Sequence, residues 1–343
     1  MNHDRIGDIY PQILFEDRKP IPNLVIRLHA RRGKGGFQPW DKPVGEFCGK
    51  VSILERRFLL PLANYTRLFH VRNVLLFGDH PSVYPELEYA LDCFSRRVEN
   101  IVLCLRPGQA RGSESLIASK VRQIVYFIGP FADVSSGTAD VFPLLKGEIQ
   151  SIRKANNSIS IKAVLYLSFQ GIMEIDRLIQ KVEEAGFDRL DFFPPNLFIG
   201  GAGERCLRPM GHELVGSREP MVSLEKRFWD MLEERCFESW LFDLNQTRRQ
   251  MKRVLNYFKA ALGLGDFSPP YCRASRIAFY VDSDAAIRCC PYQEAFGNLG
   301  KKSLLEISKG EALRYFRSNL NLARNDICPV CPGTYPHLLW RTR

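Results

Sequence analysis

The chain has 343 residues, of which 45% are hydrophobic and 25% charged, a composition typical of a folded globular protein of about two domains. It contains no apolar run of the roughly 18 residues that a membrane-spanning helix needs, and its first residues lack the positive-then-apolar pattern of an export signal. We therefore expect a cytoplasmic protein with no membrane association. Lysine and arginine total 48 against 38 aspartate and glutamate, giving a formal net charge of +10. No basic run alternates with aromatic residues, so we interpret the excess as a basic surface and disfavour nucleic acid as a partner.

Residues 1–22 contain three prolines and mixed polarity, which predicts an irregular N-terminal arm. Strand-like and helix-like segments then alternate as far as residue 193. Strands are expected at 23–30, 74–77, 101–105, 124–128, 159–167 and 189–193, and helices at 52–69, 85–97, 113–120, 138–154 and 171–185. A loop rich in glycine and proline separates the first strand from the first helix, at 31–49.

This alternation predicts an α/β fold with a parallel sheet and right-handed crossovers. Six strand–helix units are too few for a closed eight-stranded barrel. They fit either an open half-barrel or a doubly wound sheet, and in both arrangements a site forms where the strands end. We therefore assign residues 23–200 to this α/β domain.

The remainder of the chain has a different character. Residues 200–220 predict a surface loop and 222–264 are helical in pattern, so we interpret 201–268 as a loop and helical linker. A Ser-Pro-Pro break precedes a C-terminal cysteine-rich domain at 269–343. There, a strand at 277–281, a polar turn at 282–286 and a strand at 287–289 predict a small hairpin. A helix capped by Ser303 and Glu306 follows, broken near Gly310 and ending at about Leu320.

Five of the ten cysteines lie in this C-terminal segment: Cys272, Cys289, Cys290, Cys328 and Cys331. In a long chain without an export signal, cysteines indicate metal ligands or buried thiols rather than disulfides. The last two form a Cys-x-x-Cys pair, whose thiolates can reach one centre. Four thiolates from the hairpin and the terminal pair could bind either zinc or a 4Fe–4S cluster, and four buried thiols without a ligand are the alternative.

The order of these features resembles the SPASM domain, the C-terminal auxiliary-cluster module of radical S-adenosylmethionine (SAM) proteins. It runs from a cysteine and a hairpin to Asp284 and Cys290, then Gly-Asn-Leu, Ser-Leu-x-Glu-Ile and Cys-x-x-Cys. The resemblance is to the short, four-cysteine form and implies a single auxiliary 4Fe–4S cluster. The ligands it implies are Cys272, Cys290, Cys328 and Cys331, with Cys289 as the alternative to Cys290 and zinc as the alternative occupant.

The strand–helix units also resemble the partial (β/α)6 barrel of that superfamily. Gly78, Asp79, His80 and Pro81 follow the second strand, where the family carries a Gly-Gly-Glu-Pro motif that holds the amino group of SAM. Here Asp79 and His80 replace the second glycine and the glutamate. The loop after the first strand should carry Cys-x-x-x-Cys-x-x-Cys, yet it holds only Cys48, and the motif occurs nowhere in the sequence. We therefore regard these four residues as a relic of the motif and SAM binding as doubtful.

These observations lead to three functional hypotheses. The first is a degenerate radical SAM/SPASM protein, a pseudoenzyme that keeps one cluster. It serves as a substrate-binding or electron-relay subunit beside an active radical SAM enzyme that modifies a peptide or small molecule. The second is an enzyme that uses the altered barrel mouth with a nucleotide or another ligand. The third is a zinc-stabilised module that binds acidic partners.

Overall fold

The computed structural model of the chain describes residues 22–31, 51–129, 141–194, 225–226, 229–230, 234, 244–267, 277–290, 292–320 and 327–331. Several predicted features lie outside this part of the chain: the N-terminal arm before residue 22, the loop at 32–49, the loop at 200–220, and Cys272. No helix in the described part is both long and apolar enough to cross a membrane.

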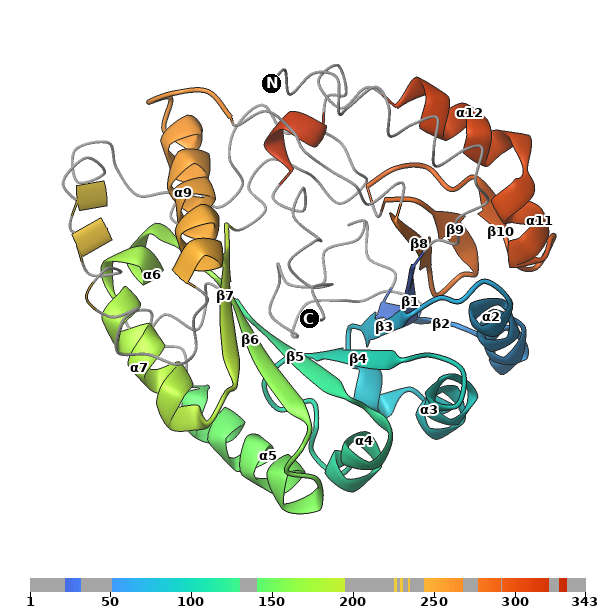
Figure 1. Cartoon of the computed structure of the whole chain (residues 1–343), viewed down its shortest axis with the longest axis horizontal. Helices are drawn as coiled ribbons and strands as arrows, with labels where there is room; N and C mark the ends of the chain where they lie inside the picture. Colours follow the sequence, from blue (N-terminus) through green and yellow to red (C-terminus); the bar gives the residue numbers. More distant parts are fainter. Residues whose placement is uncertain are drawn as a thin grey trace.

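The described strands form one curved sheet, seen along its strands in Figure 1. Its order is β10-β9-β8-β1-β3-β4-β5-β6-β7, and β2 pairs with the end of β1. From β8 to β7 every neighbouring pair is parallel, whereas β2, β9 and β10 pair antiparallel. The strands are β1 (Asn23–Arg31), β2 (Val51–Ile53), β3 (Asn73–Gly78), β4 (Asn100–Leu105), β5 (Gln123–Ile128), β6 (Ser160–Tyr166), β7 (Arg189–Phe193), β8 (Ala278–Val281), β9 (Ala286–Arg288) and β10 (Gly297–Asn298).

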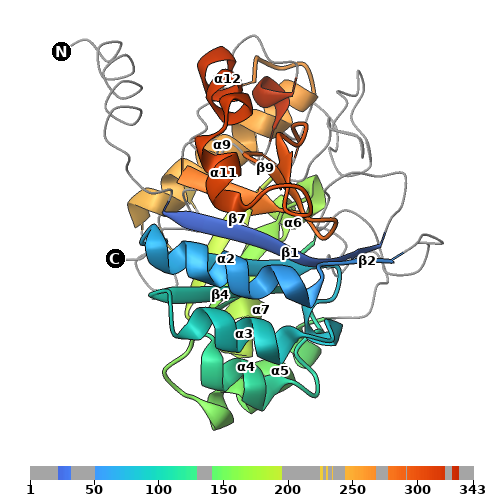
Figure 2. The ribbon, with the colours of Figure 1, turned by 90° about the vertical axis from the view of Figure 1, so that its right-hand side faces the viewer.

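Helices cover the outer, convex face of this sheet (Figures 1 and 2). They are α2 (Arg56–Leu68), α3 (Leu87–Ser95), α4 (Glu114–Lys120), α5 (Phe142–Ala155), α6 (Phe169–Met173) and α7 (Ile175–Ala185). Helix α9 (Leu244–Ala261) packs against β7 at one edge of the sheet. Helices α11 (Leu304–Lys309) and α12 (Glu311–Asn319) follow the hairpin of β8 and β9 at the other edge. The short 3-10 helices are η1 (Pro81–Val83) and η5 (Cys328–Val330).

The strands are buried on both faces, which explains their almost continuous apolar sequences. All six residues of β4 are buried. Ile101 and Leu103 belong to the large core between sheet and helices, whereas Val102 and Cys104 belong to a separate cluster with Val25, Phe127 and Tyr166. Because neighbouring residues of a strand point to opposite faces, this second cluster marks the concave face of the sheet.

The predicted α/β fold with a partial barrel is confirmed, since the six predicted strands are parallel neighbours and the described sheet is open. The predicted hairpin and the helix break at Gly310 are also present. One expected helix began too early, because Val51–Ile53 pairs with β1 and the helix starts only at Arg56. The predicted helix at 171–185 is two helices, divided at Glu174.

The sequence did not predict that β8 pairs parallel with β1. Asn23 lies opposite Ala278 and Ile26 opposite Val281. The hairpin of β8 and β9, which precedes Cys289 and Cys290, therefore adds strands to the sheet beside β1. Asn23 strengthens this junction, since its side-chain amide donates to the carbonyl of Ile277 over 3.0 Å. The domain division near residue 268 stays a prediction, but the cysteine segment is joined to the sheet by backbone pairing.

Candidate cluster site and barrel mouth

The turn between β8 and β9 is held by two aspartates. Asp282 accepts a hydrogen bond from the backbone N–H of Ser283 at 2.8 Å, and Asp284 accepts one from Ala286 at 3.1 Å. Aspartate side chains stabilise tight turns through such local bonds. Ala285, directly after Asp284, has a φ of 64°, a left-handed conformation that is uncommon for residues other than glycine. The turn fixes where the next strand begins and so where Cys289 and Cys290 lie.

The two neighbouring cysteines occupy different environments. Cys289 is fully buried in the main core, beside the Arg317 side chain of α12. Burial raises the pKa of Cys289 to about 11, and the Arg317 charge offsets part of that rise. Cys290 is half-buried. This difference favours Cys290 over Cys289 as the residue available to a metal centre.

The Cys-x-x-Cys pair lies on one turn of 3-10 helix, which we call the knuckle (Cys328–Cys331). The N–H of Cys331 donates to the carbonyl of Cys328, and both cysteines are half-buried. Residues three apart on a 3-10 helix are eclipsed, so the two side chains leave the same side of the turn. Val330 is fully buried, and its carbonyl accepts a hydrogen bond from the Tyr257 hydroxyl of α9 at 3.4 Å.

Three of the four predicted ligands are therefore placed, and Cys272 lies outside the described residues. Among the residues that the structure describes, no three His, Cys, Asp or Glu side chains lie close enough together to hold a metal ion. The knuckle brings Cys328 and Cys331 together, whereas their convergence with Cys290 and Cys272 stays a prediction. The donor set suits soft metals and iron–sulfur clusters, which thiolates bind.

The predicted relic of the SAM motif forms a tight turn at the end of β3. A Cβ on Gly78 would lie 2.8 Å from the carbonyl oxygen of His29, so the close approach of β1 requires glycine. Asp79 donates its N–H to that same carbonyl at 3.1 Å. His80 contacts the Ser82 hydroxyl through Nδ1 at 3.0 Å, and buried Pro81 begins η1. Asp79 and His80 thus have different neighbours, as expected for adjacent residues at a strand end.

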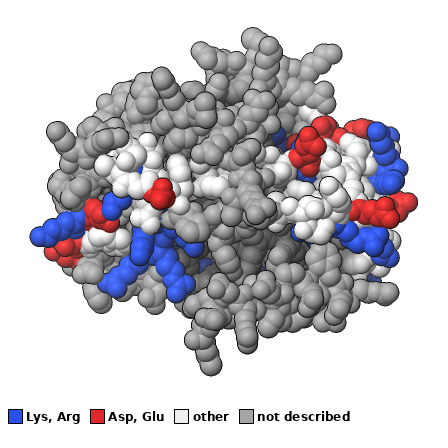
Figure 3. Space-filling view, turned by 90° about the horizontal axis from the view of Figure 1, so that it is seen from above, with Lys and Arg blue, Asp and Glu red and all other residues white. Residues whose placement is uncertain are grey.

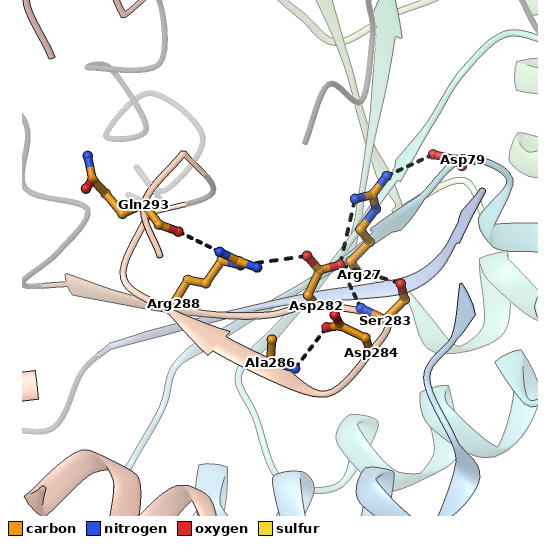
Figure 4. A network of polar contacts seen from close by, with 8 residues as sticks. All are labelled: Arg27, Asp79, Asp282, Ser283, Asp284, Ala286, Arg288 and Gln293. Atoms are coloured by element: carbon orange, nitrogen blue, oxygen red, sulfur yellow. Dashed lines mark hydrogen bonds and ion pairs between the residues drawn. The ribbon is translucent and has the colours of Figure 1, made fainter. Parts of the chain in front are cut away.

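A chain of alternating charges connects this turn with the cysteine hairpin (Figure 4). Arg27 of β1 lies 3.3 Å from Asp79 through Nη2 and 3.7 Å from Asp282 through Nη1. The other carboxylate oxygen of Asp282 lies 3.8 Å from Nε of Arg288. All four side chains are largely buried, with exposures between 12% and 26%, so solvent screens them less than surface pairs.

Sequence reasoning missed Arg27, Asp282 and Arg288 as parts of this site. A signal was present, because Arg27 is a charged residue between the apolar residues Ile26 and Leu28 of a strand. Its partners could not be identified, since Asp282 is distant in the sequence and the pairing depends on β8 lying beside β1.

A second buried ion pair lies on the concave face, between Lys162 of β6 and Asp191 of β7, whose side chains are 7% and 4% exposed. Nearer the ends of the strands, three aromatic rings form a row. The ring centroids of Phe127 and Tyr166 are 6.1 Å apart, and those of Tyr166 and Phe193 are 5.9 Å apart. The concave face is therefore filled by packed side chains in this part of the sheet.

Comparison with known proteins assigns a domain to the C-terminal part of the chain. Residues 272–332 match the SPASM family, an iron–sulfur cluster-binding domain. No curated protein matches the chain.

The solved structures with a similar fold include the following two. Streptococcus suis SuiB bound to precursor peptide SuiA has a TM-score of 0.58 at 12% identity, covering 99% of this chain and 77% of that one. The protein anSMEcpe with bound AdoMet has a TM-score of 0.55 at 12% identity, covering 90% and 87%. The fold is thus similar to that of these two radical SAM proteins, and the C-terminal segment matches the SPASM domain.

Proposed function

We propose that this chain, a radical SAM fold joined to a SPASM iron–sulfur cluster-binding domain, is a non-catalytic subunit of a radical SAM modification system. It binds one auxiliary 4Fe–4S cluster through Cys272, Cys290, Cys328 and Cys331. The main support for the proposal is that the sequence keeps the auxiliary-cluster domain but lacks the cysteine motif of the SAM-binding cluster. The cluster-binding domain matches over residues 272–332, while Cys-x-x-x-Cys-x-x-Cys is missing from all 343 residues.

The arrangement of the cysteines supports the ligand assignment. Cys328 and Cys331 leave the same side of the knuckle, and buried Val330 anchors that turn beside α9. Cys289 is buried in the core beside Arg317, whereas Cys290 is half-buried. We therefore assign Cys290 as the ligand from the hairpin. When bound, a cluster of this type accepts and donates single electrons. The chain's own contribution is to hold the thiolates and to shield them partly from water.

The turn after β3 supports the absence of SAM cleavage. Three thiolates hold the SAM-binding cluster of the superfamily, and one cysteine in the loop at 31–49 cannot replace them. At the mouth, the Asp79 carboxylate faces Arg27 and its backbone N–H bonds to His29. This arrangement joins the relic of the motif to the cysteine hairpin through Asp282, so the mouth serves as a structural junction.

Substrate binding is the part of the proposal that rests on the relatives. One similar structure holds a precursor peptide and another holds AdoMet. We extend the first of these to a peptide or small-molecule substrate that a partner radical SAM enzyme modifies. The chain then presents the substrate or relays electrons to and from it.

The proposal is tested by incubating the reduced, anaerobically purified protein with SAM and measuring 5′-deoxyadenosine. We expect no formation above the background of a Cys328→Ala/Cys331→Ala variant. Turnover above that background would refute the non-catalytic role and favour an enzyme at the barrel mouth. Elemental analysis of the same sample separates the occupants, because zinc without iron would favour the zinc-stabilised module.

A further inference from the structure

A hollow of about 520 Å³ opens at the edge of the sheet opposite the barrel mouth. It is lined by Arg67, His70, Val71, Arg72, Arg97 and Glu99. These residues come from the end of α2, the loop before β3, and the segment between α3 and β4. Because β3 and β4 begin here and end at the mouth, the hollow is distinct from the candidate cluster site.

The lining carries an excess of positive charge, with three arginines against one carboxylate. The single ion pair among them is long, 4.0 Å from Arg72 Nε to Glu99 Oε1, and both side chains are at least 70% exposed. Such a pair contributes little to stability. Arg97 donates to the carbonyl of Cys93 at 2.7 Å. Among the residues that the structure describes, the side chains of Arg67 and His70 have no hydrogen-bond or ion-pair partner.

The backbone beneath these side chains is firmly fixed. His70 has a φ of 51°, which turns the chain sharply at the end of α2, and Val71 then bonds to the Thr66 carbonyl at 2.9 Å. The N–H of Arg72 donates to the carbonyl of Pro22 at 2.9 Å. Val71 is buried and forms the apolar part of the lining. The arginine side chains are therefore carried by backbone that is held in place by hydrogen bonds.

Favourable interactions with helix dipoles explain the positions of only two of the three arginines. Cations near helix C-terminal ends are favourable, which accounts for Arg67 in the last turn of α2 and for Arg97 just after α3. Arg72 lies beyond the helix, in the loop that leads into β3, and its charge adds to theirs. Three arginines around one hollow create a positive potential that attracts an anion.

We propose that this hollow binds a small anion that carries a phosphate group. Arginine presents a planar fork of donors that matches two phosphate oxygens, and such charge-assisted bonds are short and strong. A hollow of this volume is large enough for a nucleotide-sized molecule. The phosphate belongs either to a nucleotide or to inorganic or sugar phosphates, and both share the chemistry that the arginines recognise.

The test is a calorimetric titration of the full-length protein with pyrophosphate, at ionic strength held constant with potassium chloride. We expect saturable binding that weakens by about tenfold or more in an Arg67→Gln/Arg72→Gln variant, since two charge-assisted contacts are lost. Arg177→Gln, which changes an exposed arginine on α7, is the matched control and should bind like the parent protein. Urea unfolding of each variant verifies that the fold is intact.

Two results would overturn the proposal. The first is a pyrophosphate titration that releases or absorbs no more heat than a titration with potassium chloride. The second is equal binding of pyrophosphate by the parent and the double variant, which would mean that the arginines serve only to stabilise helix ends. A parallel titration with ADP separates the ligand sources. Tighter binding of ADP than of pyrophosphate supports a nucleotide, and equal or weaker binding supports the simpler phosphates.

Discussion

The turn after β3 and the C-terminal knuckle are held in different ways. At the turn, Asp79 is bonded through its N–H to His29, through its carbonyl to Gln109 and through its carboxylate to Arg27. At the knuckle, buried Val330 and the bond from Tyr257 anchor one short 3-10 turn that carries two half-buried thiols. The barrel mouth is thus held by several contacts within the chain, whereas few contacts hold the knuckle, and under the proposed function a metal centre adds to its stability. Changes to the two regions should therefore have different consequences.

The largest expected effect is the loss of the metal centre. Cys328→Ala should remove nearly all bound iron, because a four-thiolate cluster does not survive the loss of a ligand from its Cys-x-x-Cys pair. Iron and sulfide analysis measures this loss directly. Cys93→Ala is the matched control, since Cys93 is buried in α3, far from the proposed ligands in sequence, and its removal should leave the iron content unchanged. Retention of the cluster in Cys328→Ala would contradict the assignment.

The barrel should be most sensitive at its buried ion pair. Lys162→Met leaves the Asp191 carboxylate buried without its partner, which should cost about 3 to 5 kcal/mol in the free energy of unfolding measured with urea. The double variant Lys162→Met/Asp191→Asn should cost less, because no charge remains buried. Equal losses in the single and double variants would show that packing, rather than the charge, stabilises this position.

A smaller effect is expected at the turn after β3. Gly78→Ala places a methyl group 2.8 Å from the His29 carbonyl oxygen, and the resulting shift of β1 should cost roughly 1 to 3 kcal/mol. Gly147→Ala on α5 is a matched control, because apart from its chain neighbours and the nearby backbone of its own helix no described atom lies within 4 Å of the added group. There the better helix propensity should raise stability by about 0.5 to 1 kcal/mol. Thermal unfolding of both variants checks the opposite signs.

The smallest effect concerns the helix that follows the hairpin. Ser303 and Glu306 form a capping box at α11, and Ser303→Ala should cost about 1 kcal/mol in thermal or urea unfolding. The hydrogen bonds from Ser303 lower the pKa of Glu306 below its ordinary value of 4.5. Because the folded-state pKa is lowered, this contribution is present above pH 4.5 and is lost as the pH falls through the folded value. The difference in stability between the parent and Ser303→Ala should therefore shrink in acid, where only the bond from the Glu306 N–H to the Ser303 hydroxyl remains, and a constant difference would contradict the pairing.

The parallel strands could be predicted because each is a short apolar run that ends at a turn residue, as in β4 and β5. Local chemistry also predicted the capping box and the break at Gly310. Two features could not be predicted, because they depend on long-range pairing. The three-residue strand β2 has too little sequence to show a period, and the parallel contact of β1 with β8 joins residues more than 250 positions apart. The network around Arg27 exists only because of that contact.

The cysteines show the same limit in the candidate site. Their spacing predicts a thiolate centre, and the knuckle geometry follows from Cys-x-x-Cys on a single turn. The environments of Cys289 and Cys290 do not follow from the sequence, because the partner of Cys289 is Arg317 on a later helix. The distinction between a core thiol and a ligand therefore required the packing of α12 on the hairpin.

The most direct test of the central claim is the iron and acid-labile sulfide content of the parent protein purified without oxygen, combined with electron paramagnetic resonance after reduction. We expect about four irons and four sulfides per chain and the signal of one reduced 4Fe–4S cluster. About eight irons per chain would show a second cluster and contradict the loss of the SAM site. Zinc without iron would contradict the cluster itself.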